Sequence, residues 1–259
     1  MTRILGIVNI TSDSFSDGGR FLAPRAATAH ANALIAAGAH AVDLGPASTH
    51  PDAETVLPQE EIRRLAPVVD ALDVPISIDS YHPQTQRWAL AQGVAFLNDI
   101  QGFPHPELHA ELADSDTTLI AMFSVQATGG ATRQASDPST VLQRIHHFFD
   151  ARVDALMTAG VPRERLILDP GMGFFLGTDP ACSLRVLQSI AALRDRYDLP
   201  ILVSVSRKSF LRALTGSPLD RIGAATLSAE LAAARRGAAW IRTHDVAALR
   251  DGLAVQQAL

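Results

Sequence analysis

Short apolar segments recur along the entire chain, and longer amphipathic stretches separate them. Each segment is rich in Ile, Val or Leu and lacks strict apolar–polar alternation, a pattern typical of parallel β-strands that are covered on both faces. The expected strands cover residues 4–10, 41–45, 76–80, 96–100, 118–123, 165–170, 201–206 and 239–244. Eight strand–helix units in 259 residues predict an α/β protein with a single-domain (β/α)8 TIM barrel spanning residues 1–259.

The stretches between the expected strands carry helical signals. Apolar residues recur at helical spacing over residues 24–38, 58–72 and 138–159. The first stretch begins with Pro24, which suits a first helical turn, and ends at Gly38, which suits a helix terminus. A doubly wound open sheet is the alternative fold, but no GxGxxG turn follows an expected strand, which favours the barrel.

Composition and charge exclude several functions. Hydrophobic residues make up 47% and charged residues 19%, which fits a soluble globular protein. The net charge is −5 and basic residues cluster at most in pairs, so we expect no nucleic-acid partner. No apolar run reaches the ~18 residues of a membrane span, and the N-terminal MTRILGIVNITSD turns polar too early for a signal peptide, so we expect a cytoplasmic protein with no membrane partner. Cys182, the only cysteine, is expected to pack in a helix.

Polar residues lie at the ends of all eight expected strands. They are Asn9, Asp43, Asp79, Asn98, Asp99, Ser124, Asp169, Ser206, Arg207, Lys208, Arg242 and His244. A single Asp after a strand is usually a helix cap or a turn residue. A complete ring of acids, amides and bases is costly to bury without partners. Because the carboxyl ends of barrel strands form the active-site face, the ring predicts a functional site there.

The ring has two chemical halves. One half consists of Asp43, Asp79, Asn98 and Asp169, which offer hydrogen bonds to a planar, nitrogen-rich ligand. The other half consists of Asn9, Lys208, Arg242 and His244, which suit an anion such as pyrophosphate. The Asn9 amide oxygen is a candidate Mg²⁺ ligand, because Mg²⁺ prefers oxygen ligands and takes few of them from protein. A salt bridge to a neighbouring strand-end Asp is the alternative interpretation of Arg242. The ring indicates an enzyme that acts on a heterocyclic pyrophosphate.

Seven segments, in order along nearly the whole chain, resemble the dihydropteroate synthase family. They are NITSDSFSDGGRF (9–21), VDLGPASTHPDAE (42–54), SIDSYHP (77–83), LNDIQGFP (97–104), LDPGMGFF (168–175), SVSRKSF (204–210) and IRTHDV (241–246). THPDAE, FLNDIQGFP, DPGMGFFLG and SVSRKSFL are most similar to the sulfonamide-insensitive, Sul-type branch of that family.

The resemblance implies a reaction in folate biosynthesis. 6-Hydroxymethyl-7,8-dihydropterin pyrophosphate would be joined to p-aminobenzoate, with Mg²⁺ as cofactor, to give 7,8-dihydropteroate and pyrophosphate. In the implied dissociative step, pyrophosphate leaves and a delocalised pterin cation forms before the aniline nitrogen attacks. Loops 11–21 and 46–54 would order over the bound anion and build the aminobenzoate site, excluding water from the cation.

The resemblance also implies a role for individual residues. The implied catalytic residues are Asp79, Asp169 and Lys208. The implied pterin-binding residues are Asp43, Asp79, Asn98, Ile100, Met122, Asp169 and Lys208. The implied pyrophosphate-binding residues are Asn9, Arg242 and His244, of which Asn9 is also the metal ligand. The implied p-aminobenzoate-binding residues are Thr49, Pro51, Phe174, Ser206 and Lys208.

The chain departs from the wider family at three places. His50 stands where an Arg is common, and Pro46-Ala47-Ser48 replaces a Gly-Glu-Ser sequence; both features occur in the Sul-type branch. Phe123 stands where the family, including that branch, usually has His. If the family's His only packs at the barrel rim, Phe is tolerable. If it helps to position pterin or phosphate, turnover should fall.

Two adjacent aromatic residues, Phe174 and Phe175, lie in the loop LDPGMGFFLG. Phe174 is expected to form a wall of the aminobenzoate pocket. Gly171 and Gly173 allow the backbone of the loop to come close to the pterin that Asp169 would bind. Phe175 replaces a small or polar residue of the wider family. Two aromatics that fill a gap in the loop are one interpretation. The other is a bulkier wall that excludes the tetrahedral sulfone of a sulfonamide and spares a flat carboxylate, which predicts sulfonamide insensitivity.

Three rival functions stay open. A pterin-binding barrel that transfers a methyl group to a corrinoid protein would share the pterin residues, but it needs no aminobenzoate site such as STHPD (48–52) with SRKS (206–209). A catalytically impaired homologue would bind pterin without turnover. A phosphate-binding isomerase or aldolase would not combine Asn98-Asp99 and Asp79 with SRKS. We also expect a homodimer. Its interface could include Leu227, Leu231 and Leu249, but the same pattern fits ordinary packing within the barrel.

Overall fold

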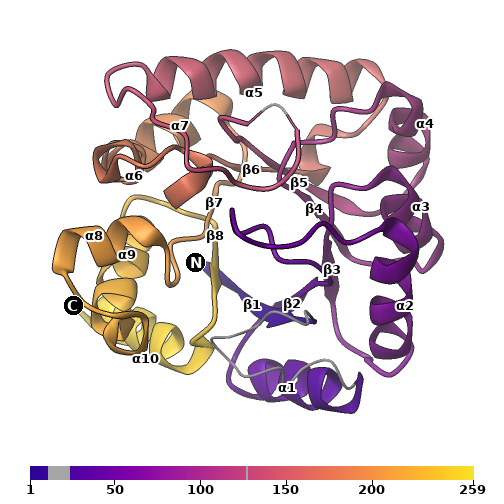
Figure 1. The fold of residues 1–259 in the computed structure, drawn as a ribbon, viewed down its shortest axis with the longest axis horizontal. Helices are drawn as coiled ribbons and strands as arrows, with labels where there is room; N and C mark the ends of the chain where they lie inside the picture. Colours follow the sequence, from indigo (N-terminus) through magenta and orange to yellow (C-terminus); the bar gives the residue numbers. More distant parts are fainter. Residues whose placement is uncertain (11–23, 127) are drawn as a thin grey trace.

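The computed structural model describes residues 1–10, 24–126 and 128–259, and eight parallel strands within them form one curled sheet (Figure 1). The strands are β1 (Arg3–Asn9), β2 (Ala41–Gly45), β3 (Ile76–Asp79), β4 (Phe96–Asp99), β5 (Thr118–Met122), β6 (Leu166–Asp169), β7 (Leu202–Val203) and β8 (Trp240–Thr243). Their order in the sheet is β6-β5-β4-β3-β2-β1-β8-β7. The two edge strands meet where Leu168 pairs with Ile201 and the Leu168 N–H donates to the Pro200 carbonyl at 2.9 Å. The predicted barrel is therefore confirmed, and the open-sheet alternative is wrong.

Helices surround this barrel. In the described part of the chain the α-helices are α1 (Pro24–Ala36), α2 (Pro58–Val69), α3 (Pro83–Ala91), α4 (Pro106–Asp114), α5 (Val141–Thr158), α6 (Pro180–Gln188), α7 (Ile190–Tyr197), α8 (Ser209–Thr215), α9 (Gly223–Arg235) and α10 (Val246–Ala258). Figure 1 shows α2, α3 and α4 along one side of the sheet and α8, α9 and α10 along the opposite side. The helix predicted from residue 138 begins at Val141, because the Asp137 carboxylate accepts the Ser139 N–H at 2.8 Å and holds a turn there.

All eight predicted strands are present, but the seventh is shorter than expected. Residues 204–206 were expected to extend β7, which ends at Val203. The Lys208 N–H donates to the Val205 carbonyl at 3.1 Å, and Arg207 adopts a positive φ of 59°. A non-glycine residue in this conformation marks a tight turn. The turn directs the end of the strand out of the sheet and places the side chains that follow it.

The side chains inside the barrel change from apolar to polar along the strands. The apolar layer consists of Leu5, Ala41, Ile120, Ile167, Leu202 and Trp240, with Phe96 packed against it. Residues from so many strands can meet only inside the barrel. Because successive side chains of a strand point to opposite faces, the next inward residue lies two positions further on. On β2, β6 and β8 that residue is Asp43, Asp169 and Arg242, respectively.

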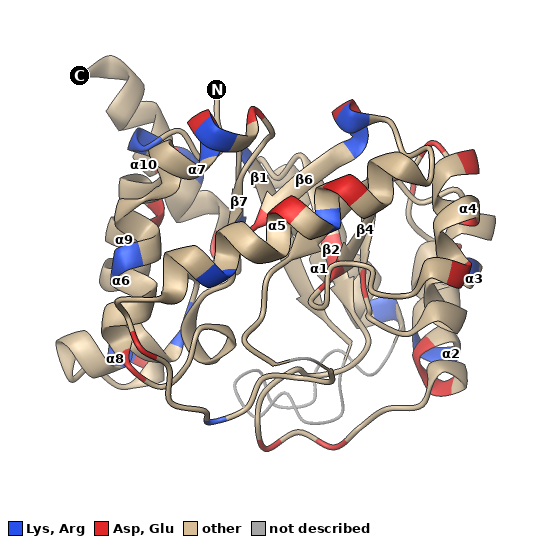
Figure 2. Ribbon diagram, turned by 90° about the horizontal axis from the view of Figure 1, so that it is seen from above, with Lys and Arg blue, Asp and Glu red and all other residues tan. Residues whose placement is uncertain are grey.

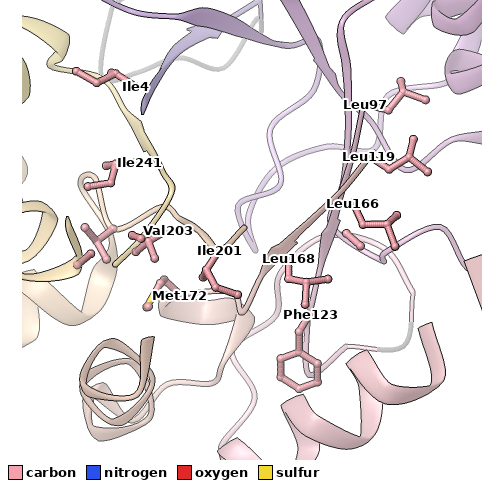
Figure 3. Close-up of a cluster of buried hydrophobic side chains, with 14 of the residues drawn as sticks. Ile4, Leu97, Leu119, Phe123, Leu166, Leu168, Met172, Ile201, Val203 and Ile241 are labelled. Carbon is pink, nitrogen blue, oxygen red and sulfur yellow. The ribbon is translucent and has the colours of Figure 1, made fainter. Parts of the chain in front are cut away.

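A second and larger apolar layer lies between the sheet and the helices, and it contains Phe123. Phe123 is buried and packs edge-on against Phe148 of α5, with ring centroids 5.4 Å apart. Figure 3 shows it beside Leu168 in this outer layer. Its predecessor on the chain, Met122, belongs to a different cluster at the barrel mouth. The Phe123 side chain is thus a packing residue that points away from the barrel interior.

The other apolar predictions also concern this outer layer. Cys182 is fully buried in α6, as predicted. Leu249 of α10 is fully buried, and Leu227 and Leu231 of α9 pack against the same core. A Cβ added at Gly252 would lie 3.1 Å from both leucines of α9, so the two helices are in close contact. Leu249 thus packs inside the protomer, and Leu227 and Leu231, which are partly buried, contact the protomer's own core, so the expected homodimer stays a prediction.

The outer surface carries mixed charge. Arg residues are interspersed with Asp and Glu over the helices of the described residues (Figure 2). Within those residues, none of the helices combines the length and the apolar character that a membrane crossing requires.

The position of Phe123 predicts a stability effect. Phe123→Ala should lower the free energy of unfolding by about 3–5 kcal/mol, because the buried ring is lost and leaves a cavity beside Phe148. Phe174→Ala, in a loop and only partly buried, is the control and should cost less. Urea denaturation followed by circular dichroism measures both. Equal losses in the two variants would contradict this packing role.

Candidate active site

A polar layer closes the carboxyl end of the barrel, directly above the apolar interior. Asp43 and Asn98 are buried, and their side chains meet because the Asn98 amide donates to Asp43 Oδ2 at 3.2 Å. Strand pairing places Asp79 opposite Asn98 and Asp169 opposite Met122. Asp169 also interacts electrostatically with Asp43. The four residues that were predicted to hold a planar ligand therefore lie together at the carboxyl end of the barrel.

Arg242 is the centre of this layer. Its Nε donates to Asp43 Oδ2 at 2.5 Å, and its Nη2 donates to Asp79 Oδ2 at 2.7 Å. The salt bridge that was the alternative interpretation of Arg242 is present, and it is double. A buried ion pair of this kind costs several kcal/mol when one partner is removed, because the remaining charge is left without compensation. Arg242 therefore fixes two carboxylates at the mouth of the barrel.

The environment shifts the pKa values of the layer. Burial raises the pKa of Asp79 to about 7, although the Arg242 charge opposes the shift. Burial also raises the pKa of Asp169 to about 6. The Gly171 N–H, which donates to Asp169 Oδ1 at 2.8 Å, opposes this shift. Burial would lower the pKa of Arg242, but Asp43 and Asp79 outweigh it and raise that pKa. Asp79 and Asp169 thus have pKa values raised toward neutral pH, as groups at functional sites often do.

Lys208 faces this acidic layer from the turn after β7. Burial lowers the pKa of Lys208 to about 8, and the Arg242 charge lowers it further, while Asp169 and Asp79 raise it. Its Nζ lies 4.8 Å from the centre of the Phe175 ring. Lys208 is also the only lysine in the sequence, whose other basic side chains are arginines and histidines. A lysine can lose its charge at a buried site and an arginine cannot, so this choice is itself a sequence signal for the site.

A cavity of about 690 Å³ opens above the layer. The predicted site residues that line it are Asn9, Thr49, Pro51, Asp79, Phe174, Ser206, Lys208, Arg242 and His244. His244 Nδ1 lies 2.9 Å from Ser206 Oγ, and burial with the charge of Arg207 holds the pKa of His244 well below its ordinary value. The predicted anion and aminobenzoate residues thus share one cavity. The predicted loop 11–21 lies outside the described residues.

The remaining predicted pterin residues lie beside this cavity and do not line it. They are Asp43, Asn98, Ile100, Met122 and Asp169. Four atoms of the polar layer are buried without a hydrogen-bond partner in the described part of the chain: Asp43 Oδ1, Ser77 Oγ, Asn98 Oδ1 and Ser204 Oγ. Buried polar groups in proteins are nearly always paired, so a concentration of unpaired ones indicates a polar ligand.

Apolar side chains form one wall of the mouth. The mouth cluster consists of Ile100, Met122, Ala131 and Phe175, with Tyr81 and Phe174 packed against it. Phe175 is buried, whereas Phe174 is partly exposed and meets the His50 ring edge-on at 5.9 Å. Both phenylalanines line the cavity. The two phenylalanines fill the gap in the loop and also form part of the cavity wall. The gap-filling interpretation and the pocket-wall interpretation are therefore compatible.

Two glycines of the loop after β6 lie in close contact with other parts of the protein. Gly171 has φ +73°, and an added Cβ would lie 2.4 Å from the Phe123 carbonyl oxygen. Gly173 has φ +66°, and its Cβ would lie 3.4 Å from the Lys208 side chain. A close approach of the backbone is present at both glycines. It brings the loop after β6 against the end of β5 and against the Lys208 side chain.

A buried network outside the cavity was missed by the sequence analysis. Glu61 of α2 is buried, and its Oε2 accepts the hydroxyls of Ser80 and Thr85, each at 2.6 Å. Gln86 of α3 donates to the Ser80 carbonyl at 2.8 Å and to Asp99 Oδ2 at 2.9 Å. The network ties α2 and α3 to the strand ends that carry Asp79 and Asn98. Polar residues on helices seldom signal burial in a sequence, so only the proximity of these residues to strand ends could have revealed them.

Asp99 belongs to that network, and its expected place in the ring was wrong. It is fully buried and accepts the backbone N–H groups of Gln101 at 2.7 Å and Phe103 at 2.9 Å. Strand alternation explains the difference, because Asn98 points inward and its neighbour must point outward. Asp99 therefore shapes the loop after β4.

A metal at this site would need few protein ligands. Among the described residues, no group of three or more His, Cys, Asp or Glu side chains could hold a metal ion. Asn9 ends β1 and lines the cavity, and its Oδ1 lies beside Gly45, where an added Cβ would be 3.6 Å away. This donor set fits Mg²⁺ only if phosphate oxygens and water complete its coordination, which is the usual arrangement for this ion.

Comparison with known proteins agrees with the barrel fold. The family model described as pterin binding enzyme matches residues 5–244. The chain is 58% identical to the dihydropteroate synthase type-2 of Escherichia coli, with 99% of this chain and 95% of that protein covered. The dihydropteroate synthase of Xanthomonas albilineans solved with 4-aminobenzoic acid is 36% identical with a TM-score of 0.89, covering 99% of this chain and 92% of that one. The dihydropteroate synthase of Yersinia pestis solved with a sulfonamide drug complex is 31% identical with a TM-score of 0.90, covering 99% and 94%.

These likenesses span the whole barrel and the strand ends that carry the polar layer. The chain belongs to the family of pterin-binding enzymes and, within it, to the dihydropteroate synthases, which are transferases.

The single lysine allows a direct test of the site's electrostatics. Reductive ¹³C-methylation should give one lysine resonance in the NMR spectrum, and it should titrate near the pKa of about 8 of Lys208. Asp169→Asn should lower that pKa further, because the Asp169 charge raises it. Asp195→Asn, on the exposed face of α7, is the control and should leave it unchanged. Titration near the ordinary lysine value of about 10.4 would contradict the lowered pKa of Lys208.

Proposed function

We propose that the chain condenses 6-hydroxymethyl-7,8-dihydropterin pyrophosphate with p-aminobenzoate, giving 7,8-dihydropteroate and pyrophosphate in folate biosynthesis. The observation that carries the proposal is the set of unpaired buried polar atoms beside Arg242, among them Asp43 Oδ1 and Asn98 Oδ1. A pterin ring edge presents the N–H groups that such oxygens accept. Ile100 and Met122, at the same mouth, would pack on the ring faces.

The polar layer suits the proposed dissociative step. Departure of pyrophosphate leaves a cation delocalised over the pterin, and the carboxylates of Asp79, which lines the cavity, and of the buried Asp169 would stabilise that charge. Lys208, which lines the cavity, would contact the pterin and cover the aminobenzoate. Because its pKa is about 8, Lys208 is charged in a large share of molecules at neutral pH and can balance the leaving anion.

Asn9, Arg242 and His244 would bind the leaving pyrophosphate. All three line the cavity, and Arg242 would have to share its donors between the anion and the two aspartates. His244 carries a low pKa and would act as a neutral hydrogen-bond donor. Asn9 would hold Mg²⁺, which neutralises charge on the departing phosphates when it is bound.

Thr49, Pro51, Phe174 and Ser206 would form the aminobenzoate site. They line the same cavity as Lys208, which supports a shared location for the two substrates. We further propose that the Phe174–Phe175 wall makes the enzyme insensitive to sulfonamides, as in the Sul-type branch. Phe175 is buried against Met122 and Ala131, so it has little freedom to move aside for a bulkier ligand.

The remaining expectations are part of the same proposal. A cytoplasmic location and a homodimer fit an enzyme of this family. The outward packing of Phe123 against Phe148 supports full turnover, since the substitution lies outside the cavity. A catalytically impaired homologue is the outcome that the next experiment would reveal.

Pyrophosphate release by the purified protein tests the reaction. With Mg²⁺, the dihydropterin pyrophosphate and p-aminobenzoate, release should depend on aminobenzoate, should stop with EDTA, and should persist with sulfamethoxazole. Lys208→Ala should lower kcat by at least about tenfold, because the transition state loses an electrostatic contact. Arg87→Ala, on the distant α3, is the matched control and should keep wild-type rates. No release from protein that binds the pterin would contradict the proposal.

Phe175→Ser tests the proposed drug exclusion. Sulfamethoxazole should inhibit this variant up to a few hundredfold more tightly than wild type, since a misfit of ~3–4 kcal/mol would be relieved. The KM for p-aminobenzoate should change much less. Phe123→Leu, which alters an aromatic residue outside the cavity, is the control and should stay insensitive. Tight inhibition of the wild-type enzyme would rule the exclusion out.

A further inference from the structure

A short segment after β5 connects two loops at the cavity. The bridging segment, residues 128–134, follows β5 in the sequence, yet it contacts the loop after β2 (residues 46–54) and the loop after β6 (residues 170–179). Its Ala131 N–H donates to the Thr49 carbonyl at 2.9 Å. A Cβ added at the adjacent Gly130 would lie 3.1 Å from that same oxygen, so the two backbones are in close contact.

The bridging segment is joined to the loop after β6 as well. The Thr178 N–H donates to the Gln134 carbonyl at 2.9 Å. Ala131 is buried in the mouth cluster with Phe175. One short segment thus contacts two of the three loops that supply the proposed aminobenzoate site, the third being the turn after β7 with Ser206 and Lys208.

Arg133 repeats this double contact with a single side chain. Its two terminal nitrogens donate to the two carboxylate oxygens of Asp52, in the loop after β2. Its guanidinium carbon also lies 5.7 Å from the centre of the Phe174 ring, in the loop after β6. An arginine is suited to this task, because its planar group pairs with a carboxylate through two bonds and stacks on an aromatic face.

The position of Asp52 gives the pair a consequence for the cavity. Asp52 lies between Pro51 and Ala53, and all three line the cavity with Thr49. Holding Asp52 against Arg133 therefore sets how far this wall stands from Phe174. Both partners are about half exposed, at 51% for Arg133 and 60% for Asp52. An exposed pair adds little to global stability, so its removal should act on the loop and leave the fold intact.

We propose that Arg133 is a positioning residue that fixes the loop after β2 over the aminobenzoate subsite by joining Asp52 to Phe174. The subsite's substrate rests on the proposed function, but the contact between the loops does not. Arg133 itself does not line the cavity, so it acts through Thr49, Pro51 and Phe174.

Charge reversal and charge exchange test this proposal through steady-state kinetics. Arg133→Glu should raise the KM for p-aminobenzoate about tenfold, because Glu repels Asp52, and should leave the KM for the pterin substrate nearly unchanged. The double variant Asp52→Arg with Arg133→Glu should recover most of the loss. Arg87→Glu, which reverses the exposed Arg87–Glu111 pair between α3 and α4, is the matched control and should change neither KM.

Hydrogen exchange supplies a readout that needs no turnover. Arg133→Glu should speed amide exchange across residues 48–54, and the double variant should slow it again. An unchanged aminobenzoate KM in Arg133→Glu, or equal rises for both substrates without recovery, would overturn the proposal. If the wild type shows no turnover, the proposed function fails and hydrogen exchange alone tests the role of Arg133. Faster amide exchange at residues 48–54 in Arg133→Glu would then support that role. Unchanged exchange would overturn it.

Discussion

The double ion pair of Arg242 with Asp43 and Asp79 is the interaction on which the rest of the site depends. It places a positive charge between the buried carboxylate of Asp43 and the partly exposed carboxylate of Asp79, where the barrel interior turns polar. Without it the aspartates would be left uncompensated, and neutralisation by protons would be the usual result. With it, one half of the mouth keeps acceptors for a planar ligand and the other half keeps donors for an anion.

Much of this architecture could be predicted from the sequence, because it follows from two local rules. Buried parallel strands appear as short runs of Ile, Val and Leu, and alternation along each strand places Asp43, Asp169 and Arg242 inward at the carboxyl ends. The same rule could have excluded Asp99, which follows the inward-facing Asn98. What the rule does not reveal is which inward groups pair with each other. The Arg242 pairs span 199 and 163 residues, so only the closed barrel brings their members together.

The loops above the barrel were less predictable for a physical reason. Their positions depend on contacts between segments that are distant in sequence, such as Arg133 with Asp52 and Gly171 with the Phe123 carbonyl. The buried Glu61–Ser80–Thr85 network is a similar case, since its acid comes from a helix that reads as amphipathic. Phe123, in contrast, is noticeable in the sequence but has only a packing role in the structure. It departs from the family's pattern, and its ring packs against α5.

A crystal structure with 6-hydroxymethyl-7,8-dihydropterin pyrophosphate, in the absence of p-aminobenzoate, tests the account most directly. The pterin edge should hydrogen-bond to Asn98, Asp43 and Asp169, and the pyrophosphate should contact Asn9, Arg242 and His244. Such a complex would show that the unpaired atoms of the polar layer exist for the pterin. A pterin bound elsewhere, with Asp43 Oδ1 and Asn98 Oδ1 still unpaired, would contradict the account.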